Sequence, residues 1–387
     1  MTNLPLSLNL LRICAQGLIA RTQAGNVTDA VRNLLAVQGQ QVSALPHALL
    51  MRTSNTTIKD VADAFAAGKL IRSRPMRGTV HVTTAADYHW MRLTLNHTHS
   101  PYNLRQMAEH GVDEKMLQDA TEIAHAAIAT AGGAISREEL FKVWEQNLTG
   151  AKTPAVSFRR IANILVWSLD CEGTLAEGPL GKNQHYFINA SQLPAADSDA
   201  SGFKISEPGA PAGLAEVVRR YIWGHGPVGV ADLARWAGIS KTVAWKALET
   251  AVESPGLCRM KLADMQLRPA AAVTNLKQAQ ELFYLRADLP QILAENEAEV
   301  KRLMYLPSFD ELHVGYQNRT CLTDAAGEKL ICPAANGMFR PLVVKGGRLL
   351  GVNPVQQGLQ WLEKPDARTE EETLATIETM KTRLQNQ

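Results

Sequence analysis

The strongest constraint on the fold is a helix-turn-helix pattern at residues 230–248, VADLARWAGISKTVAWKAL. Two segments with apolar residues at helical spacing are separated there by Gly238, which suits a tight turn. The sequence also predicts a helix before this pair, at residues 214–223, and a hairpin after it, at residues 259–269. Three helices followed by a β-hairpin are typical of a winged helix-turn-helix domain.

The same order of elements is predicted twice earlier in the chain. In the first copy, N-terminal helices precede residues 70–82, where a Pro/Gly turn joins two short strands. The second copy contains an alanine-rich helix at residues 114–130 and a helix that begins at the capping box of Ser136 and Glu139. Its remaining elements are a helix at residues 154–170 and a hairpin at residues 174–188.

We therefore predict a mainly α fold with β structure (α+β), with tandem winged helix-turn-helix domains and a small C-terminal β-barrel. The barrel is expected because short strands separated by Gly, Asn and Pro follow residue 303. A helix at residues 369–387, with Thr369 and Glu372 as its capping box, closes the chain. The predicted parts are a first winged helix with the Gln-x-Gln motif at residues 1–95, a second at 96–192, a linker at 193–212, a third at 213–275, and the barrel-like domain with its helix at 276–387.

Composition indicates an ordinary globular protein, with 45% hydrophobic and 20% charged residues. The net charge of +2 does not indicate a nucleic-acid binder, so DNA binding would depend on locally placed arginines. The 5 cysteines form no CxxC pair, which favours free thiols in a reducing cytosol over disulfides or zinc. His97 and His99 have no third ligand beside them, so we expect no metal and no cofactor.

The apolar run near the N-terminus is interrupted by Asn9, Arg12 and Gln16, and no basic residue precedes Arg12. It therefore fits a buried helix at residues 6–20 better than a signal sequence. No stretch approaches the ~20 apolar residues that span a bilayer. We expect a cytoplasmic monomer that does not associate with membranes.

Gln38, Gly39 and Gln40 lie where the helical pattern that includes Leu34 and Val37 stops. Gly39 makes a break from the helix easy, because it has no Cβ. On extended backbone, residues two apart share a face, so Gln38 and Gln40 would project two neutral amides to one side. Two glutamines near a helix end usually belong to a solvated terminus. The pattern alone therefore leaves two interpretations open, a reactive site and two polar residues in a loop.

Four motifs and this glutamine pair, spread over nearly the full chain, carry a resemblance to a known family. The motifs are AQGL at 15–18, MRGTVH at 76–81, LPSFDE at 306–311 and NGMFRP at 336–341. They resemble the AlkZ/YcaQ group of winged-helix DNA glycosylases, and Gln38-Gly39-Gln40 falls where that family places its catalytic Gln-x-Gln. The chain departs from the family at Gly39, where a larger aliphatic residue is usual, and at residues 351–354, where a Thr-Trp pair is common.

The resemblance implies that Gln38 and Gln40 are catalytic, in monofunctional removal of alkylated purines and, in some members, unhooking of interstrand crosslinks. Loss of a base passes through an oxocarbenium-like state, for which most sites supply a carboxylate. Glutamine can position water and orient a dipole, but it cannot take a proton at neutral pH. It would suffice for N7-alkylguanine or N3-alkyladenine, which carry a positive charge and leave as neutral bases. We therefore expect double-stranded DNA that carries cationic alkylated purines as the partner.

Seven residues are candidates for contacts with DNA. Arg72, Arg74 and Arg77 lie on the first predicted hairpin and would contact phosphates, although an ordinary exposed hairpin explains them equally well. His81 would lie near DNA, but a lone histidine in a strand is more often packed against its neighbours.

The other candidates are near the C-terminal motif. Asp310 would either supply charge near the site or cap a turn. Tyr316 and Arg319 would belong to a hairpin that probes DNA.

Two other functions stay open on the sequence alone. A non-catalytic winged-helix DNA-binding protein or transcriptional regulator would use residues 241–248 as its recognition helix. Regulators usually combine one such domain with an effector module, which argues against that interpretation. A winged-helix scaffold for protein partners is the third possibility, and it predicts no salt-sensitive DNA binding.

Overall fold

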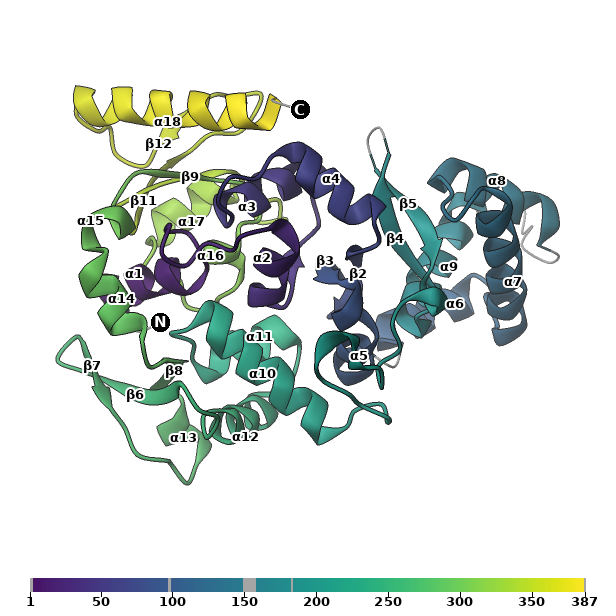
Figure 1. The fold of residues 1–387 in the computed structure, drawn as a ribbon, viewed down its shortest axis with the longest axis horizontal. Helices are drawn as coiled ribbons and strands as arrows, with labels where there is room; N and C mark the ends of the chain where they lie inside the picture. The colour runs from purple at the N-terminus through teal and green to yellow at the C-terminus, as the bar shows by residue number, and fades with distance from the viewer. Residues whose placement is uncertain (1–2, 97–98, 149–157, 182–183, 386–387) are drawn as a thin grey trace. The chain divides into compact units, whose positions relative to one another are not determined.

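The chain divides into two compact units in the computed structural model, which describes residues 3–96, 99–148, 158–181 and 184–385 (Figure 1). Unit 1 joins residues 1–61 to residues 215–387, and unit 2 consists of residues 62–214. The first hairpin, at residues 70–82, therefore lies in the same compact unit as the rest of residues 62–214. The part predicted at residues 1–95 instead places this hairpin with the N-terminal helices.

Unit 1 is built mainly from short helices, several of which begin at identifiable caps. Asn26 accepts a hydrogen bond from the backbone N–H of Asp29, and Ser240 accepts one from that of Val243. The α-helices of this unit are α1 (Leu6–Ala15), α2 (Val27–Leu34), α3 (Leu45–Met51), α10 (Pro211–His225), α11 (Val230–Ala237), α12 (Lys241–Ala251), α13 (Leu276–Ala279), α14 (Leu289–Glu295), α15 (Glu297–Val300), α16 (Glu311–Val314), α17 (Ala325–Ile331) and α18 (Ala367–Gln385).

Two antiparallel sheets complete unit 1. The first has the order β12-β11-β10-β9, with β9 (Met304–Leu306), β10 (Leu342–Lys345), β11 (Arg348–Val352) and β12 (Gln360–Trp361). The second has the order β7-β6-β8, with β6 (Leu257–Ala263), β7 (Gln266–Pro269) and β8 (Leu282–Arg286). The core below the first sheet is formed by α1, through Leu10, Ile13 and Cys14, and by the strands β9 and β10.

The predicted C-terminal β-barrel is wrong, because no sheet within the described residues closes on itself. The strands of the first sheet are short, β9 and β12 lie at opposite edges, and β8 pairs with β6 in the other sheet. Helix α18 lies along the first sheet in Figure 1, and its buried face includes Ile377 and Met380. The apolar side chains on this face of the first sheet are therefore covered by helix α18, and the sheet stays open instead of closing into a barrel.

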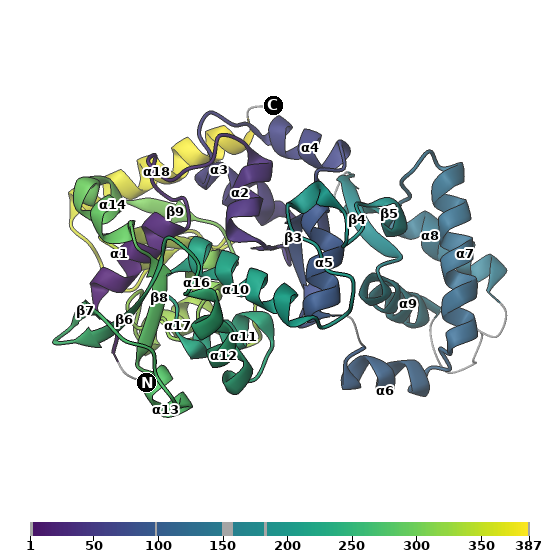
Figure 2. The same cartoon turned by 60° about the horizontal axis from the view of Figure 1, so that its bottom comes forward.

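Unit 2 carries a sheet in which β3, β2, β4 and β5 follow one another. Figure 2 labels three of these strands, β3, β4 and β5. The strands are β2 (Leu70–Met76), β3 (Thr79–Thr84), β4 (Leu175–Leu180) and β5 (His185–Asn189). The helices are α5 (Ala85–Leu95), α6 (Pro101–Glu109), α7 (Glu114–Thr130), α8 (Arg137–Asn147) and α9 (Phe158–Glu172), while α4 (Ile58–Ala66) and the first turn of α10 cross the division between the units. Helices α7, α8 and α9 pack around a core that includes Trp144 and Phe187.

Local signals account for much of this secondary structure. The capping box of Ser136 and Glu139 is confirmed at the start of α8. The turn between β2 and β3 is formed by Arg77 and Gly78 with φ values of 54° and 68°, as a two-residue hairpin turn of type I′ requires. The predicted linker packs against α5, where Phe203 contacts Trp90 with ring centroids 5.2 Å apart. None of the helices within the described residues is long and apolar enough to span a membrane.

Several predicted boundaries differ from the structure. Helix α1 ends at Ala15 instead of residue 20, because Gly17 adopts φ 71° and the N–H of Leu18 donates to the carbonyl of Ile13, as in a Schellman motif. The predicted capping box of Thr369 and Glu372 is wrong. Helix α18 begins earlier, the N–H of Thr369 donates to Asp366, and Glu372 pairs with Lys345. The predicted start of α9, at residue 154, lies outside the described residues.

Gly224 allows the close approach of α10 to the end of α2, and its replacement tests this contact. A Cβ at this position would lie 2.3 Å from the carbonyl oxygen of Asn33 and 3.1 Å from Cα of Leu34. We expect Gly224→Ala to lower the free energy of unfolding by about 1–3 kcal/mol, measured by urea denaturation. Gly25→Ala is the control, because no atom lies within 4 Å of the added Cβ. Equal losses in both variants would contradict the proposed contact.

Candidate functional site

Gln38 is fixed in an extended segment directly after a sharp end of α2. The helix ends at Leu34, and the buried Leu35 adopts φ 65° and ψ −47°. Strand β1 (Val37–Gln38) follows. The sequence pattern predicts that the helix continues to Gly39, whereas in the structure it ends before Val37. A left-handed conformation is unfavourable for a bulky residue and is kept only where the surroundings enforce it.

The backbone and the side chain of Gln38 have different environments. Its backbone N–H donates to Oε1 of Glu311 at 2.7 Å. Its side-chain oxygen Oε1 is buried and has no hydrogen-bond partner within the described part of the chain. Gly39 is buried, and Gln40 is exposed. The site thus offers one anchored glutamine with an unused acceptor and a second, more accessible glutamine two residues later.

The segment that contacts Gln38 also begins with an unusual backbone conformation. Phe309 has φ 61° and is buried. Asp310 then caps α16, because its carboxylate accepts the N–H of Leu312 at 2.9 Å. Glu311, the first residue of α16, is only 2% exposed. Left-handed residues at Leu35 and Phe309 therefore flank the two sides of the contact between Gln38 and Glu311.

A buried ion pair holds α16 against α3. The guanidinium of Arg52 donates from Nη1 to Oδ2 of Asp310 at 2.8 Å and from Nη2 to Oδ1 at 2.9 Å. Both side chains are at most 1% exposed. Burial alone would lower the pKa of Arg52, but the Asp310 carboxylate raises it above its ordinary value. Arg52 therefore keeps its charge inside the unit.

A chain of hydrogen bonds extends this pair to α10. Arg52 also donates to Oε1 of Gln16 at 2.9 Å, and Nε2 of Gln16 donates to the hydroxyl of Tyr316 at 2.9 Å. That hydroxyl donates in turn to the carbonyl of His225 at 2.7 Å. Burial raises the pKa of Tyr316, so the hydroxyl keeps its proton as a donor. The end of α10 is thereby tied to the same network as α3 and α16.

A second buried arginine supports Tyr316 from the other side. Arg12 of α1 lies over the Tyr316 ring, with its guanidinium carbon 3.6 Å from the ring centroid. Its Nη2 donates to Oδ2 of Asp232 at 3.3 Å, and Asp232 also accepts the backbone N–H of Gln317 at 2.7 Å. Each buried arginine of this region is therefore matched by a buried aspartate.

His225 places an imidazole next to Glu311. Its Nε2 lies 3.4 Å from Oε2 of Glu311, and the ring is completely buried. The ring stacks on Tyr221, with centroids 4.7 Å apart. Another histidine, His47 of α3, donates from Nε2 to the carbonyl of Tyr305 at 2.8 Å, and burial lowers its pKa to about 4.

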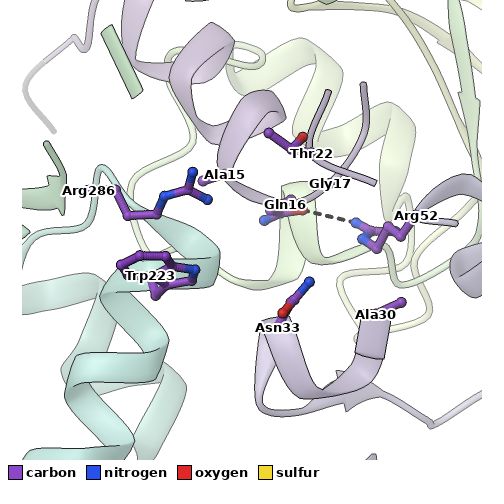
Figure 3. Close-up of a pocket in the computed structure, with 9 residues that line it drawn as sticks. All are labelled: Ala15, Gln16, Gly17, Thr22, Ala30, Asn33, Arg52, Trp223 and Arg286. Carbon is purple, nitrogen blue, oxygen red and sulfur yellow. Dashed lines mark hydrogen bonds between the residues drawn. The ribbon is translucent and has the colours of Figure 1, made fainter. Parts of the chain in front are cut away.

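A small cavity lies beside this network, as Figure 3 shows. Gln16 and Arg52 point toward one another at one side, while Trp223 and Arg286 lie together at the other. The guanidinium carbon of Arg286 is 4.7 Å from the Trp223 ring centroid. The cavity volume is about 30 Å³. It has room for roughly one water molecule and not for a purine, so it is not a base-binding pocket.

Two of the predicted DNA-contacting residues are interior residues of unit 1. Asp310 is 2% exposed and is engaged by Arg52, while Tyr316 has no exposed surface. Neither side chain faces solvent, and both instead support the segment that contacts Gln38. Arg319 is partly exposed, and its Nε pairs with Glu328 at 3.0 Å. Burial lowers the pKa of Arg319.

The predicted arginines of unit 2 differ in their surroundings. Arg72 forms an ion pair with Glu177. Arg74 pairs with Asp170 at 3.0 Å, and burial raises the pKa of that carboxylate to about 6 although Arg74 opposes the shift. Both of these arginines therefore have their charge matched by a carboxylate inside the unit.

The last two predicted residues of the hairpin also differ. Arg77 is exposed at the turn of the hairpin. His81 is 1% exposed, and its Nδ1 lies 2.9 Å from the carbonyl of Thr79, so it is packed within the unit. Arg77 is thus the candidate of this hairpin that is most accessible to a phosphate.

Four residues of the site were not predicted from the sequence: Glu311, His225, Arg52 and Gln16. A usable signal was present at Gln16, because its amide side chain interrupts an otherwise apolar helical pattern. What the pattern did not contain is the partner of each group, which lies far away along the chain. No group of three or more metal-ligating side chains is found among the described residues.

Comparisons with known proteins agree with the resemblance of the motifs. The family model described as "DNA glycosylase AlkZ-like" matches residues 31–378. The "Interstrand DNA cross-link repair glycosylase" of Streptomyces sahachiroi is 24% identical over 351 residues, which cover 88% of this chain and 85% of that protein. The solved structure of Streptomyces sahachiroi DNA glycosylase AlkZ aligns with a TM-score of 0.65 and 21% identity, covering 99% of this chain and 97% of that one. The structural likeness shows a shared fold.

The buried pair of Arg52 and Asp310 predicts a large loss of stability when one partner is neutralised. Asp310→Asn would leave the Arg52 charge without a counterion, and we expect the free energy of unfolding to fall by about 3–5 kcal/mol. Urea or thermal denaturation measures this change. The Arg52→Met/Asp310→Leu double variant should regain part of the loss, because it removes both charges.

The control for this experiment is the exposed pair of Arg32 and Asp29, with side chains 51% and 43% exposed. Asp29→Asn should leave the free energy of unfolding nearly unchanged, since solvent screens both charges. An Asp310→Asn variant as stable as the Asp29→Asn control would contradict the assigned role of the buried pair.

Proposed function

The chain belongs to the DNA glycosylase AlkZ-like family, and we propose that it hydrolyses the N-glycosidic bond of cationic alkylated purines in double-stranded DNA. N7-alkylguanine is the foremost substrate and N3-alkyladenine the second. The name of the Streptomyces sahachiroi relative includes interstrand cross-link repair. A crosslink attached through N7 or N3 of a purine presents the same cationic leaving group, so we extend the proposal to the unhooking of such crosslinks.

The observation that carries this proposal is the buried, unpartnered side-chain oxygen of Gln38. A buried acceptor without a partner is costly in a folded protein, and functional sites are places where such a cost is tolerated. In the complex with DNA, this oxygen would accept a hydrogen bond from the attacking water and direct its negative end toward the sugar. Both actions help a transition state in which positive charge develops on the sugar ring.

The same chemistry limits the substrates that this site can process. Gln38 and Gln40 cannot remove or donate a proton at neutral pH, so they supply no general acid for a poor leaving group. An alkylated purine needs none, because it already carries the positive charge that protonation would give it. We therefore propose efficient release of cationic bases and little release of undamaged guanine or of uracil.

Contacts with DNA are proposed mainly for Arg77, within a winged-helix arrangement whose hairpin is formed by β2 and β3. The exposure of Arg77 at the turn supports this role. Arg72 and Arg74 contribute less in this proposal, since Glu177 and Asp170 already neutralise them. Each phosphate that an arginine neutralises releases counterions and steepens the salt dependence of binding.

The test is single-turnover release of free base from a duplex that contains one N7-methylguanine. We expect Gln38→Ala and Gln40→Ala each to lower the rate constant by about 10–1,000-fold, because each removes a preorganised dipole from the reacting centre. Gln41→Ala is the matched control. Gln41 is the next residue along, and its amide is engaged by the hydroxyl of Ser43 at 3.1 Å.

The outcomes separate the candidate functions. Release that depends on Gln38 and Gln40 but not on Gln41 supports the glycosylase. Salt-sensitive binding of the damaged duplex without release would instead support a non-catalytic DNA-binding protein. Uracil release as fast as release of N7-methylguanine would contradict the proposal that the base must already be positively charged before the glycosidic bond breaks.

A further inference from the structure

We propose that Glu311 is a positioning residue for Gln38. Its carboxylate, held by His225, fixes the backbone of Gln38 and thereby aims the glutamine amide at the glycosidic bond. This inference rests on the proposed function, because it assigns a role in the reaction of Gln38. The starting observation is that Oε1 of Glu311 accepts the N–H of Gln38 at 2.7 Å, although 273 residues separate the two along the chain.

The second oxygen of the same carboxylate is used by His225. Nε2 of His225 lies 3.4 Å from Oε2 of Glu311. Nδ1 of His225 is buried and has no hydrogen-bond partner within the described residues. A carboxylate oxygen has no proton to give, so the proton of this contact lies on Nε2 of His225. His225 therefore donates from Nε2 to Oε2 of Glu311.

Two acceptors on one side chain explain why this position holds a carboxylate. Glu311 accepts from the backbone N–H of Gln38 with one oxygen and from the imidazole N–H of His225 with the other. A glutamine at the same place would present one oxygen and one NH₂ group, and its NH₂ group would meet the N–H of His225. Only the carboxylate satisfies both donors at once.

The surroundings leave Glu311 and His225 little freedom to move. A Cβ at Gly315 would lie 2.6 Å from the carbonyl oxygen of Glu311, 3.1 Å from Cδ2 of His225 and 3.2 Å from Oε2 of Glu311. The absence of a side chain at Gly315 therefore provides the space in which the His225 ring and the Glu311 carboxylate meet. The hydroxyl of Tyr221 donates to the carbonyl of Gly315 at 2.8 Å, which fixes the glycine in turn.

Glu311 also links Gln38 to the interior of unit 1. It directly follows Asp310, which Arg52 holds through two hydrogen bonds. The position of Glu311 is thus set by the buried ion pair, and the position of Gln38 is set by Glu311. Misplacing a reacting group by about 1 Å can cost about 10²-fold in rate, so this chain of contacts acts on the reaction without touching the substrate.

The kinetic test combines Glu311→Gln, Glu311→Ala and Gln38→Ala in single-turnover release of N7-methylguanine from a duplex. We expect the rate constant to fall by about 10–100-fold in Glu311→Ala and by less in Glu311→Gln, which keeps an acceptor for the N–H of Gln38. Affinity for the damaged duplex should stay within about threefold of wild type, since Glu311 is buried and acts on the reacting step.

A double-mutant cycle decides whether Glu311 acts through Gln38. If it does, adding Glu311→Ala to Gln38→Ala should slow release no further. Independent, multiplicative losses would overturn the proposal, because they would show that Glu311 acts elsewhere. A Glu311→Gln variant that folds and releases base at a rate equal to wild type, with equal exchange of the Gln38 amide, would also overturn it.

Glu299→Ala is the matched control. Glu299 likewise accepts a backbone N–H from a distant segment, that of Ala20 at 2.7 Å, but it does not contact Gln38. Its loss should leave the rate constant unchanged. A loss of rate in Glu299→Ala as large as that in Glu311→Ala would attribute the effect to general destabilisation and would contradict the proposal.

Amide hydrogen exchange of Gln38 separates failure of this inference from failure of the proposed function. The Gln38 N–H should be protected in wild type and should exchange faster in Glu311→Ala. A wild type that releases no base contradicts the glycosylase proposal. In that event, unchanged exchange of Gln38 in Glu311→Ala would contradict the anchoring role as well, and faster exchange would support it.

Discussion

The site depends on the buried ion pair between Arg52 and Asp310. The pair joins the end of α3 to the start of α16 through two short hydrogen bonds between side chains that are at most 1% exposed. Two fully buried charges are costly to desolvate, so they persist only where geometry and additional hydrogen bonds are favourable. Here the additional bonds run from Arg52 to Gln16, and from Asp310 to the first turn of α16. Fixing α16 in this way also fixes Glu311, and with it Gln38.

In this arrangement the buried charged side chains have a structural role, while the side chains proposed to act in the reaction are neutral. The buried arginines Arg12 and Arg52 are each engaged by an aspartate, and they hold elements together without facing a substrate. In the proposed mechanism the groups left for the reaction are amides, which would act by orientation and by their dipoles. Such a neutral site would gain its selectivity from the substrate, since only a base that is already cationic leaves readily without an acid. Strain at Leu35 and Phe309 is consistent with a site that is held in place by the surrounding fold.

Elements that depend on local signals were predictable from the sequence. Helices α7 and α11 have the predicted bounds, and the capping box of α8 follows from residues within one turn. The open sheets found in place of the predicted barrel were not predictable, because the pairing partner of β8 is decided by packing and not by the pattern of the strand itself. For the site, the sequence pointed to Gln38 and Gln40 through a resemblance, but it could not show that Glu311 contacts Gln38. A hydrogen bond that spans 273 residues leaves no local periodicity. For the same reason, the burial of Asp310 and Tyr316 appears only in three dimensions.

In the proposed mechanism, Gln38 favours positive charge at the sugar of the damaged nucleotide. The most direct measurement compares the affinity of the wild-type protein for two duplexes. One carries a cationic azasugar in place of the damaged nucleoside, and the other carries a neutral tetrahydrofuran of the same shape. We predict tighter binding of the cationic analogue by about 100-fold or more, as expected for a mimic of the transition state, and a much smaller preference in Gln38→Ala. Equal affinity of the wild-type protein for both duplexes would contradict the claim.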